Sequence, residues 1–224
     1  ADFFKKELEE YLVFINNNQF KPREILGSYA GAVGLPQFMP SSIKRFGVDF
    51  DGDGKIDINN SAADTIGSIA NYLSKHGWIE GAPMVMQADI SEENAKRFGG
   101  GTTAKYRWQT LQNNGVKPVA GVKAEPSDLP VFIVDFPFYP AGSNDSKKLY
   151  RVGTKNFTSV LRYNSSYFYA GAVAELGTAI AALVGETGLI DGTPILPSKY
   201  DIELDPTGKG LKPDQIQVKV TPVS

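Results

Sequence analysis

The chain of 224 residues contains no cysteine and a single histidine, His76. Without cysteine there is no disulfide, thiolate metal site or cysteine nucleophile, although this absence does not select a cellular compartment. One histidine excludes a metal site with several histidine ligands. The formal charge of −2 argues against nucleic acid as a partner, because such proteins concentrate basic residues on one face. No apolar run is long enough to span a bilayer.

What the chain does contain predicts an α+β protein that is mainly helical. Apolar residues at helical spacing predict helices over 2–17 and 155–184, and a further helix capped by Asp64 and Thr65. Runs of β-forming residues between these helices predict strands. We therefore expect four parts, which are a helical core at 1–84, an inserted β-rich subdomain at 85–153, further core helices at 154–190 and an extended proline-rich tail at 191–224.

The first helix is predicted to bury one apolar stripe, formed by Phe4, Leu8, Tyr11, Leu12 and Ile15. This helix begins almost at the first residue of the chain. We therefore expect the parent protein to have a segment upstream of Ala1.

An acidic loop starts at Asp49 and follows the D-x-D-x-D-G pattern of an EF-hand calcium loop. Counted from Asp49, aspartates occupy positions one, three and five, glycine position six, and Lys55 offers a backbone carbonyl at position seven. The pattern departs at position twelve, where Asn60 replaces the usual glutamate, and Asp64 is the expected substitute. The loop predicts a structural Ca²⁺ site; the alternative is a solvated acidic turn without a metal.

Residues 27–42 are rich in glycine and other small residues, which allow the backbone to approach a ligand or a neighbouring helix closely. Ser28 and Gln37 in this segment supply hydroxyl and amide groups that suit sugar hydroxyls and N-acetyl groups. Tyr163 and Tyr169 offer apolar ring faces for sugars. Tight helix packing of the glycines and core packing of the tyrosines are the alternatives.

Five stretches together resemble the membrane-bound lytic transglycosylase B family, in the family's order over roughly residues 1–185. They are GSYAGAVG at 27–34, PQFMPSS at 36–42, VDFDGDG at 48–54, IGSIANY at 66–72 and RYN at 162–164. The resemblance implies a lysozyme-like core with an EF-hand-like calcium loop and a small β-rich domain. It also implies cleavage of the β-1,4 bond between N-acetylmuramic acid and N-acetylglucosamine in peptidoglycan, which leaves a 1,6-anhydromuramyl end.

The resemblance also assigns residues. It implies a substrate groove lined by Ser28, Gln37, Tyr72, Tyr163 and Tyr169, and calcium ligands at Asp49, Asp51, Asp53, Asp64 and the Lys55 carbonyl. Between Asp53 and Asp64 the chain is one residue longer than the family pattern. The expected partners are peptidoglycan glycan strands in the periplasm or envelope, at the outer membrane. A membrane is expected to be reached only through a lipid anchor outside this chain.

The family's catalytic glutamate lies upstream of the helix that opens this chain, so we expect no catalytic residue within it. Glu24 lies beside Lys21 and Arg23, which indicates an ionised carboxylate, and Glu186 follows a helix at the wrong end of the chain. Two interpretations remain open. The chain is part of an enzyme whose N-terminal fragment, with the general acid, is lost or is a separate chain and partner; or it is a non-catalytic, calcium-stabilised peptidoglycan-binding module.

Overall fold

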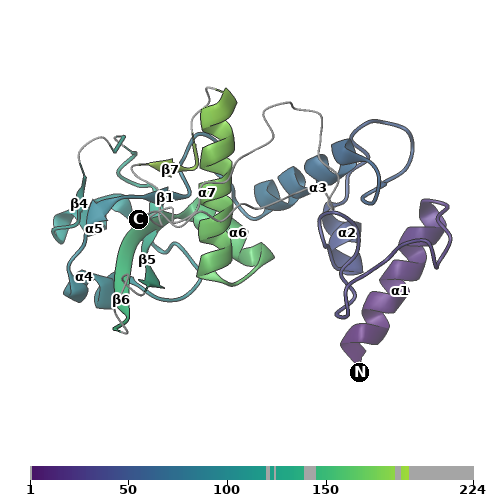
Figure 1. The fold of residues 1–224 in the computed structure, drawn as a ribbon, viewed down its shortest axis with the longest axis horizontal. Helices are drawn as coiled ribbons and strands as arrows, with labels where there is room; N and C mark the ends of the chain where they lie inside the picture. Colours follow the sequence, from purple (N-terminus) through teal and green to yellow (C-terminus); the bar gives the residue numbers. More distant parts are fainter. Residues whose placement is uncertain (1, 120–121, 124, 139–144, 185–187, 192–224) are drawn as a thin grey trace. The chain divides into compact units, whose positions relative to one another are not determined.

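The computed structural model describes residues 2–119, 122–123, 125–138, 145–184 and 188–191 (Figure 1). Contacts divide the chain into two compact units, Ala1–Gly81 and Ala82–Ser224. Glu186 and, apart from Asp191, the proline-rich tail expected at 191–224 lie outside the described residues. The expected grouping of 1–84 with 154–190 stays a prediction; the helices within 155–184 contact the sheet of the second unit.

The described part of the first unit contains helices α1 (Asp2–Asn17), α2 (Pro40–Phe46) and α3 (Ala62–Lys75). The predicted helix at 2–17 is confirmed. The predicted cap of α3 is wrong, because the helix begins earlier: Ser61 is the N-cap, and its hydroxyl accepts a hydrogen bond from the Asp64 backbone N–H. Asp64 therefore lies inside the first turn of α3, where its side chain can accept hydrogen bonds from the loop before the helix.

The apolar stripe predicted for α1 is only partly buried within the first unit. Ile15 is 4% exposed, whereas Phe4, Leu8 and Leu12 are 59, 57 and 49% exposed. The face that packs against α2 instead carries Glu7, whose carboxylate accepts a hydrogen bond from the Ser41 N–H at 2.9 Å. No side chain of its own caps α2, so an acidic residue of the neighbouring helix satisfies one of its free N–H groups.

The core of the first unit joins the glycine-rich segment to the loop that precedes α3. Gly34 has φ +71°, and a Cβ atom placed there would lie 2.8 Å from Ile58. Ile58 is fully buried, and its carbonyl accepts a hydrogen bond from the Leu35 N–H. Only glycine combines this backbone conformation with so close an approach, so Gly34 fixes the two loops against each other.

The second unit is built on a five-stranded sheet with strand order β3-β5-β6-β1-β7. Its long strands β5 (Pro130–Phe138) and β6 (Lys147–Thr154) pair antiparallel from Val131↔Thr154 to Phe138↔Lys147. The short strands β1 (Val85–Met86) and β7 (Ile190–Asp191) pair in parallel at one edge. The remaining strands are β2 (Ala88–Asp89), β3 (Tyr106–Arg107) and β4 (Lys117–Pro118), of which β2 and β4 form a separate pair.

The helices of the second unit are α4 (Glu92–Phe98), α5 (Trp108–Asn113), α6 (Lys155–Tyr163) and α7 (Tyr167–Val184). Contacts place α6 against β6 and α7 against β5. Phe132, Phe136 and Phe157 are fully or almost fully buried and meet in edge-to-face or tilted ring contacts. This aromatic cluster joins the sheet to α6, and it holds the start of α7 through Tyr167.

The helix predicted over 155–184 is in fact two helices. Residues 164–166 interrupt it, because the side chain of Asn164 accepts a hydrogen bond from the Ser166 N–H and Ser166 accepts one from the Tyr169 N–H. Such local side-chain bonds compete with helical hydrogen bonds. The interruption places Tyr163 at the end of α6 and Tyr169 in the first turn of α7.

We expect Glu7→Ala to lower the free energy of unfolding of the first unit by about 1–2 kcal/mol, because the N-terminus of α2 loses its hydrogen-bond acceptor. The readout is urea unfolding followed by Trp78 fluorescence in a Trp108→Phe background, since one of the two tryptophans lies in each unit. Glu9→Ala on the exposed side of α1 is the control and is expected to change stability by less than about 0.5 kcal/mol. Equal effects of the two substitutions would contradict the capping role of Glu7.

Candidate functional site

The acidic loop brings three carboxylates together. One oxygen from each of Asp49, Asp51 and Asp64 lies within 4.8 Å of the others. Asp49 and Asp51 come from the loop and Asp64 from the first turn of α3. Three carboxylates at such a separation repel one another unless a cation lies between them, and hard oxygen ligands suit Ca²⁺ or Mg²⁺.

Asp64 is the buried member of this cluster, with 1% of its surface exposed. Its Oδ1 accepts a hydrogen bond from the Phe50 N–H at 2.8 Å, and its Oδ2 accepts one from the Asp57 N–H at 2.8 Å. The carboxylate thus binds both arms of the loop to α3. These bonds compensate the burial of its charge.

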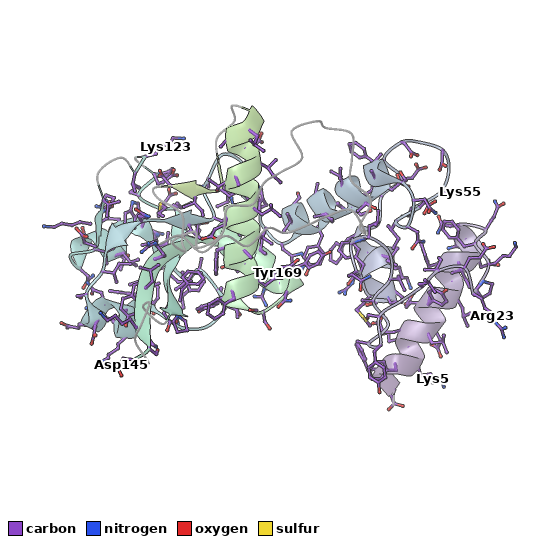
Figure 2. The ribbon with its side chains drawn as sticks, viewed as in Figure 1. Lys5, Arg23, Lys55, Lys123, Asp145 and Tyr169 are labelled. Carbon is purple, nitrogen blue, oxygen red and sulfur yellow. The ribbon has the colours of Figure 1, made fainter. Side chains whose placement is uncertain are left out.

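The turn of the loop follows the spacing expected of a calcium-binding loop. The Asp49 carboxylate accepts hydrogen bonds from the N–H groups of Gly52 at 2.7 Å and Gly54 at 2.9 Å. Gly54, at position six, has φ +88°, a conformation that favours glycine. Asp53 is not part of the three-carboxylate cluster, and its side chain accepts a hydrogen bond from the Lys55 N–H. Lys55 itself is exposed on this loop (Figure 2).

Asp57, at position nine, is a residue that the sequence interpretation missed. Its Oδ1 accepts hydrogen bonds from the backbone N–H groups of Asn59 and Asn60, both at 3.0 Å. The side-chain amide of Asn60, at position twelve, also donates to Asp57. Asn60 is therefore engaged with Asp57. The recurrence of aspartate at odd positions of the loop was the signal that could have identified it.

Ser28 and Gln37 lie on exposed turns of the glycine-rich segment. Isolated bridges pair Gly27 with Val33 and Val33 with Phe38, which holds the two turns together. The Ser28 hydroxyl accepts a hydrogen bond from the Ala32 N–H at 3.1 Å. Gln37 is exposed and has φ +50°, and its amide donates to the Gly34 carbonyl at 2.8 Å. A left-handed non-glycine residue is strained, and such strain concentrates at functional sites.

Tyr72 has a packing role within the first unit. It is 7% exposed and its ring contacts Phe38 and Phe46 and stacks on His76, with ring centroids 4.1 Å apart. Phe38 follows Gln37 directly in sequence, so Tyr72 supports the turn that carries Gln37. The sequence interpretation did not include Tyr29 among the site residues. Its side chain is fully exposed beside Ser28.

Tyr163 and Tyr169 form a pair in the second unit. Their rings are nearly parallel, with an interplanar angle of 11° and centroids 6.4 Å apart. Tyr169, labelled on α7 in Figure 2, is 38% exposed and Tyr163 is half-buried. Parallel aromatic faces of this kind suit the C–H face of a sugar ring. The predicted substrate residues therefore fall into two sets, Ser28, Gln37 and Tyr72 in the first unit and the tyrosine pair in the second.

Glu24 was weighed as a proton donor because it lies four residues before Ser28. Lys21 donates a hydrogen bond to its carboxylate at 2.9 Å, and this bond lowers the pKa of Glu24 below its ordinary value. A general acid in glycoside cleavage needs the opposite shift, so that it carries a proton near neutral pH. The shift of Glu24 is the reverse of the one that such an acid needs.

Within the described residues, none of the helices combines the length and the hydrophobicity that a bilayer-spanning segment requires.

Comparison with known proteins gives consistent results. The chain matches the family model of the transglycosylase SLT domain over residues 1–178. It is 35% identical over 191 residues to membrane-bound lytic murein transglycosylase B of Escherichia coli (strain K12), which covers 81% of this chain and 46% of that protein.

Solved structures of lytic transglycosylases resemble this structure. The E. coli lytic transglycosylase Slt35 in complex with calcium is 34% identical, with a TM-score of 0.64, over 83% of this chain and 55% of Slt35. SltB3 of Pseudomonas aeruginosa in complex with NAG-anhNAM-pentapeptide is 28% identical, with a TM-score of 0.67, over 88% of this chain and 50% of SltB3.

The chain thus spans about half the length of these relatives. The likeness confirms the predicted fold class, α+β with a lysozyme-like core. The residues match the sequence pattern of the family for more than three quarters of the chain, and the predicted resemblance is confirmed. The chain belongs to the transglycosylase SLT domain family.

Proposed function

We propose that this chain is the glycan-binding and cation-binding part of a peptidoglycan lytic transglycosylase of the bacterial envelope. The observation that carries the proposal is the family match over residues 1–178, together with relatives described as lytic murein transglycosylases. The reaction is cleavage of the bond between N-acetylmuramic acid and N-acetylglucosamine with formation of a 1,6-anhydromuramyl end. SltB3, a relative in complex with NAG-anhNAM-pentapeptide, supports both this product and a strand that carries peptides.

In this proposal the chain binds and orients the strand. The exposed Ser28 hydroxyl and Gln37 amide bind sugar hydroxyl and acetamido groups, and Tyr72 supports the turn of Gln37. The parallel rings of Tyr163 and Tyr169 stack on a sugar. A fixed strand favours attack by the muramyl C6 hydroxyl on its own C1, because an internal nucleophile needs no positioned water.

The general acid of the proposed reaction is a glutamate outside this chain. One carboxyl group suffices, because it first donates a proton to the leaving glycosidic oxygen and then accepts the proton of the C6 hydroxyl. Glu24 does not suit this role, since its ion pair with Lys21 favours the ionised carboxylate.

The same property of Glu24 favours a second candidate function, a non-catalytic peptidoglycan-binding module stabilised by a cation. The two candidates share the strand-binding residues and differ only in the product. Release of soluble fragments from the cell wall therefore separates them.

We further propose that the acidic loop binds Ca²⁺. Asp49, Asp51 and Asp64 supply carboxylate oxygens. Asp53 and the Lys55 carbonyl are added to the ligand set on the strength of the calcium-loop pattern in the sequence. Slt35, a relative, was observed in complex with calcium. The ion would relieve the repulsion among the carboxylates and hold the loop closed on α3, so its role is structural.

The complete protein is expected to release fragments with 1,6-anhydromuramyl ends from purified sacculi, because the C6 hydroxyl replaces water as the nucleophile. Mass spectrometry of the digest distinguishes these ends from reducing ends, which are heavier by one water. Reducing ends alone would indicate a hydrolase. Binding to sacculi without soluble products would support the module instead.

Calorimetry is expected to show Ca²⁺ binding to the chain and at least about a tenfold weaker affinity in Asp51→Asn, since one charged ligand is lost. Asp51 is exposed, so this substitution spares the buried hydrogen bonds of Asp64. Asp89→Asn, an exposed aspartate of the second unit, is the matched control and should bind Ca²⁺ like the wild type. Absence of binding heat in the wild-type chain would refute the site.

Tyr163→Ala is expected to weaken binding of peptidoglycan strands by about fivefold, which corresponds to roughly 1 kcal/mol of lost aromatic stacking. Tyr163→Phe keeps the ring and should retain most of the affinity. The readout is a sacculus sedimentation assay, with circular dichroism to show that both variants fold. If Tyr163→Ala binds as tightly as the wild type, the tyrosine pair does not contact the strand.

A further inference from the structure

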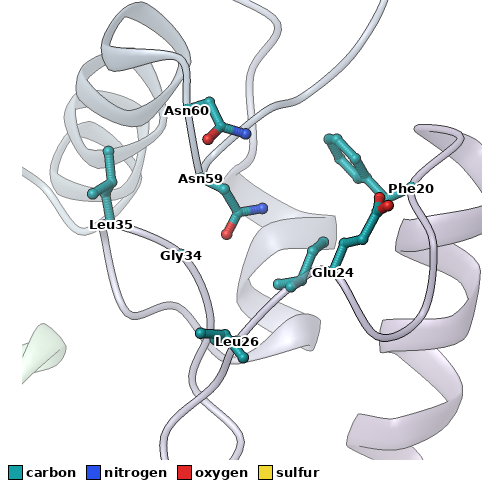
Figure 3. A pocket seen from close by; sticks show the side chains of 8 residues that line it. Phe20, Glu24, Leu26, Gly34, Leu35, Asn59 and Asn60 are labelled. Carbon is teal, nitrogen blue, oxygen red and sulfur yellow. The ribbon is translucent and has the colours of Figure 1, made fainter.

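The first unit contains an open pocket of about 350 Å³ that the proposed glycan-binding residues do not use. It lies between the loop after α1 and the residues just before α3 (Figure 3). Phe20, Leu26 and Leu35 line it with apolar side chains, and Glu24, Asn59 and Asn60 line it with polar groups. A pocket of this size, lined by both apolar and polar side chains, is large enough for a small ligand.

The two asparagines provide the amide groups of this pocket. Figure 3 shows the side chains of Asn59 and Asn60 directed into the space, opposite Phe20 and Glu24. In the described part of the chain, no hydrogen bond is found for the side chain of Asn59. A free amide can donate and accept at once, which matches the two polar groups of a peptide bond.

The wall that carries these amides is held in place before any ligand binds. The Asp57 carboxylate accepts hydrogen bonds from the backbone N–H groups of both asparagines and from the side-chain amide of Asn60. Ile58, between Asp57 and Asn59, is fully buried against Gly34. A wall that is already ordered loses little entropy when it binds a ligand.

Glu24 gives the pocket a preference for cations. Its carboxylate is ionised and paired with Lys21, and both side chains are largely exposed. Exposed ion pairs contribute little free energy, so a second ammonium group can displace Lys21 or share the carboxylate with it. An anionic ligand would be repelled, and a neutral sugar would leave Glu24 without a new partner.

We propose that this pocket binds a short peptide, with Asn59 on one of its peptide bonds, Glu24 on an ammonium group and the leucines on its apolar side chains. The inference rests on the proposed function and refines it, since the strand proposed as substrate carries peptides. The pocket then selects strands whose peptides present a free ammonium group.

The test uses an isotope-labelled sample of the whole chain and two tripeptides with blocked ends, Ala-Lys-Ala and Ala-norleucine-Ala, which differ only in the ammonium group. Titration is followed in amide NMR spectra. The lysine peptide is expected to shift the side-chain signals of Asn59 and to bind about fivefold more tightly than the norleucine peptide. Equal affinities, or no shift at Asn59, would overturn the proposal.

Two variants test the assignment of the charge. Glu24→Gln should abolish the preference for the lysine peptide, and Lys21→Met should strengthen it about two- to threefold, because the ligand no longer competes with Lys21. Glu80→Gln, an exposed glutamate elsewhere in the first unit, makes the same charge change and should alter nothing. A preference that survives Glu24→Gln would refute the role of Glu24.

Failure of this experiment is distinguishable from failure of the proposed function. The NMR titration uses free peptides and requires no cleavage, whereas the proposed function is tested by the products released from sacculi. Anhydro ends with no peptide binding would leave the proposed function standing and remove only the pocket.

Discussion

The buried carboxylate of Asp64 is the interaction on which the first unit depends. Three backbone N–H groups donate hydrogen bonds to this one side chain, those of Phe50 and Asp51 from one arm of the acidic loop and that of Asp57 from the other. A buried charge is tolerated only when it is hydrogen-bonded, so the loop cannot open without leaving Asp64 uncompensated. Asn18 provides a second connection, because its side chain accepts a hydrogen bond from the Ile56 N–H and thereby joins the loop to the end of α1.

The order imposed by Asp64 extends to the glycine-rich segment through Ile58. Asp57 and Asn59 flank Ile58, which packs on Gly34. The Ile58 carbonyl accepts a hydrogen bond from the Leu35 N–H. Gln37 lies three residues after Gly34, and its hydrogen bonds to the Gly34 carbonyl hold it in a left-handed conformation. The strained turn proposed to contact sugars is thus supported by the loop proposed to bind the cation. A bound ion and a bound strand would stabilise the same arrangement, and such coupling acts equally in both directions.

The sequence predicted what local patterns determine and missed what tertiary packing decides. Periodicity located α1, but Glu7 is buried while Phe4, Leu8 and Leu12 are exposed, so contact with the partner helix decides which residues of α1 are buried. The spacing of acidic residues located the loop, whereas the cap at Ser61 depends on which side chain bonds to the α3 backbone. The sequence predicted one helix through residues 164–166, because periodicity does not reveal hydrogen bonds between side chains and the backbone. The pocket beside Asn59 joins segments distant in sequence, and no local motif marks it.

These features separate two tasks in the proposed enzyme, the binding of the strand and the transfer of the proton. The residues proposed to bind the strand carry hydroxyl, amide and aromatic groups, which bind and orient. Glu24, four residues before Ser28, has a lowered pKa. Proton transfer needs a carboxyl group with a raised pKa in an apolar setting, and an exposed loop beside a lysine supplies the reverse. Because capture by an internal hydroxyl depends on orientation, a rigid binding surface contributes to the rate even though it transfers no proton. In the proposed enzyme the acidic loop would contribute in the same way, since its contacts through Ile58 support the turn that carries Gln37.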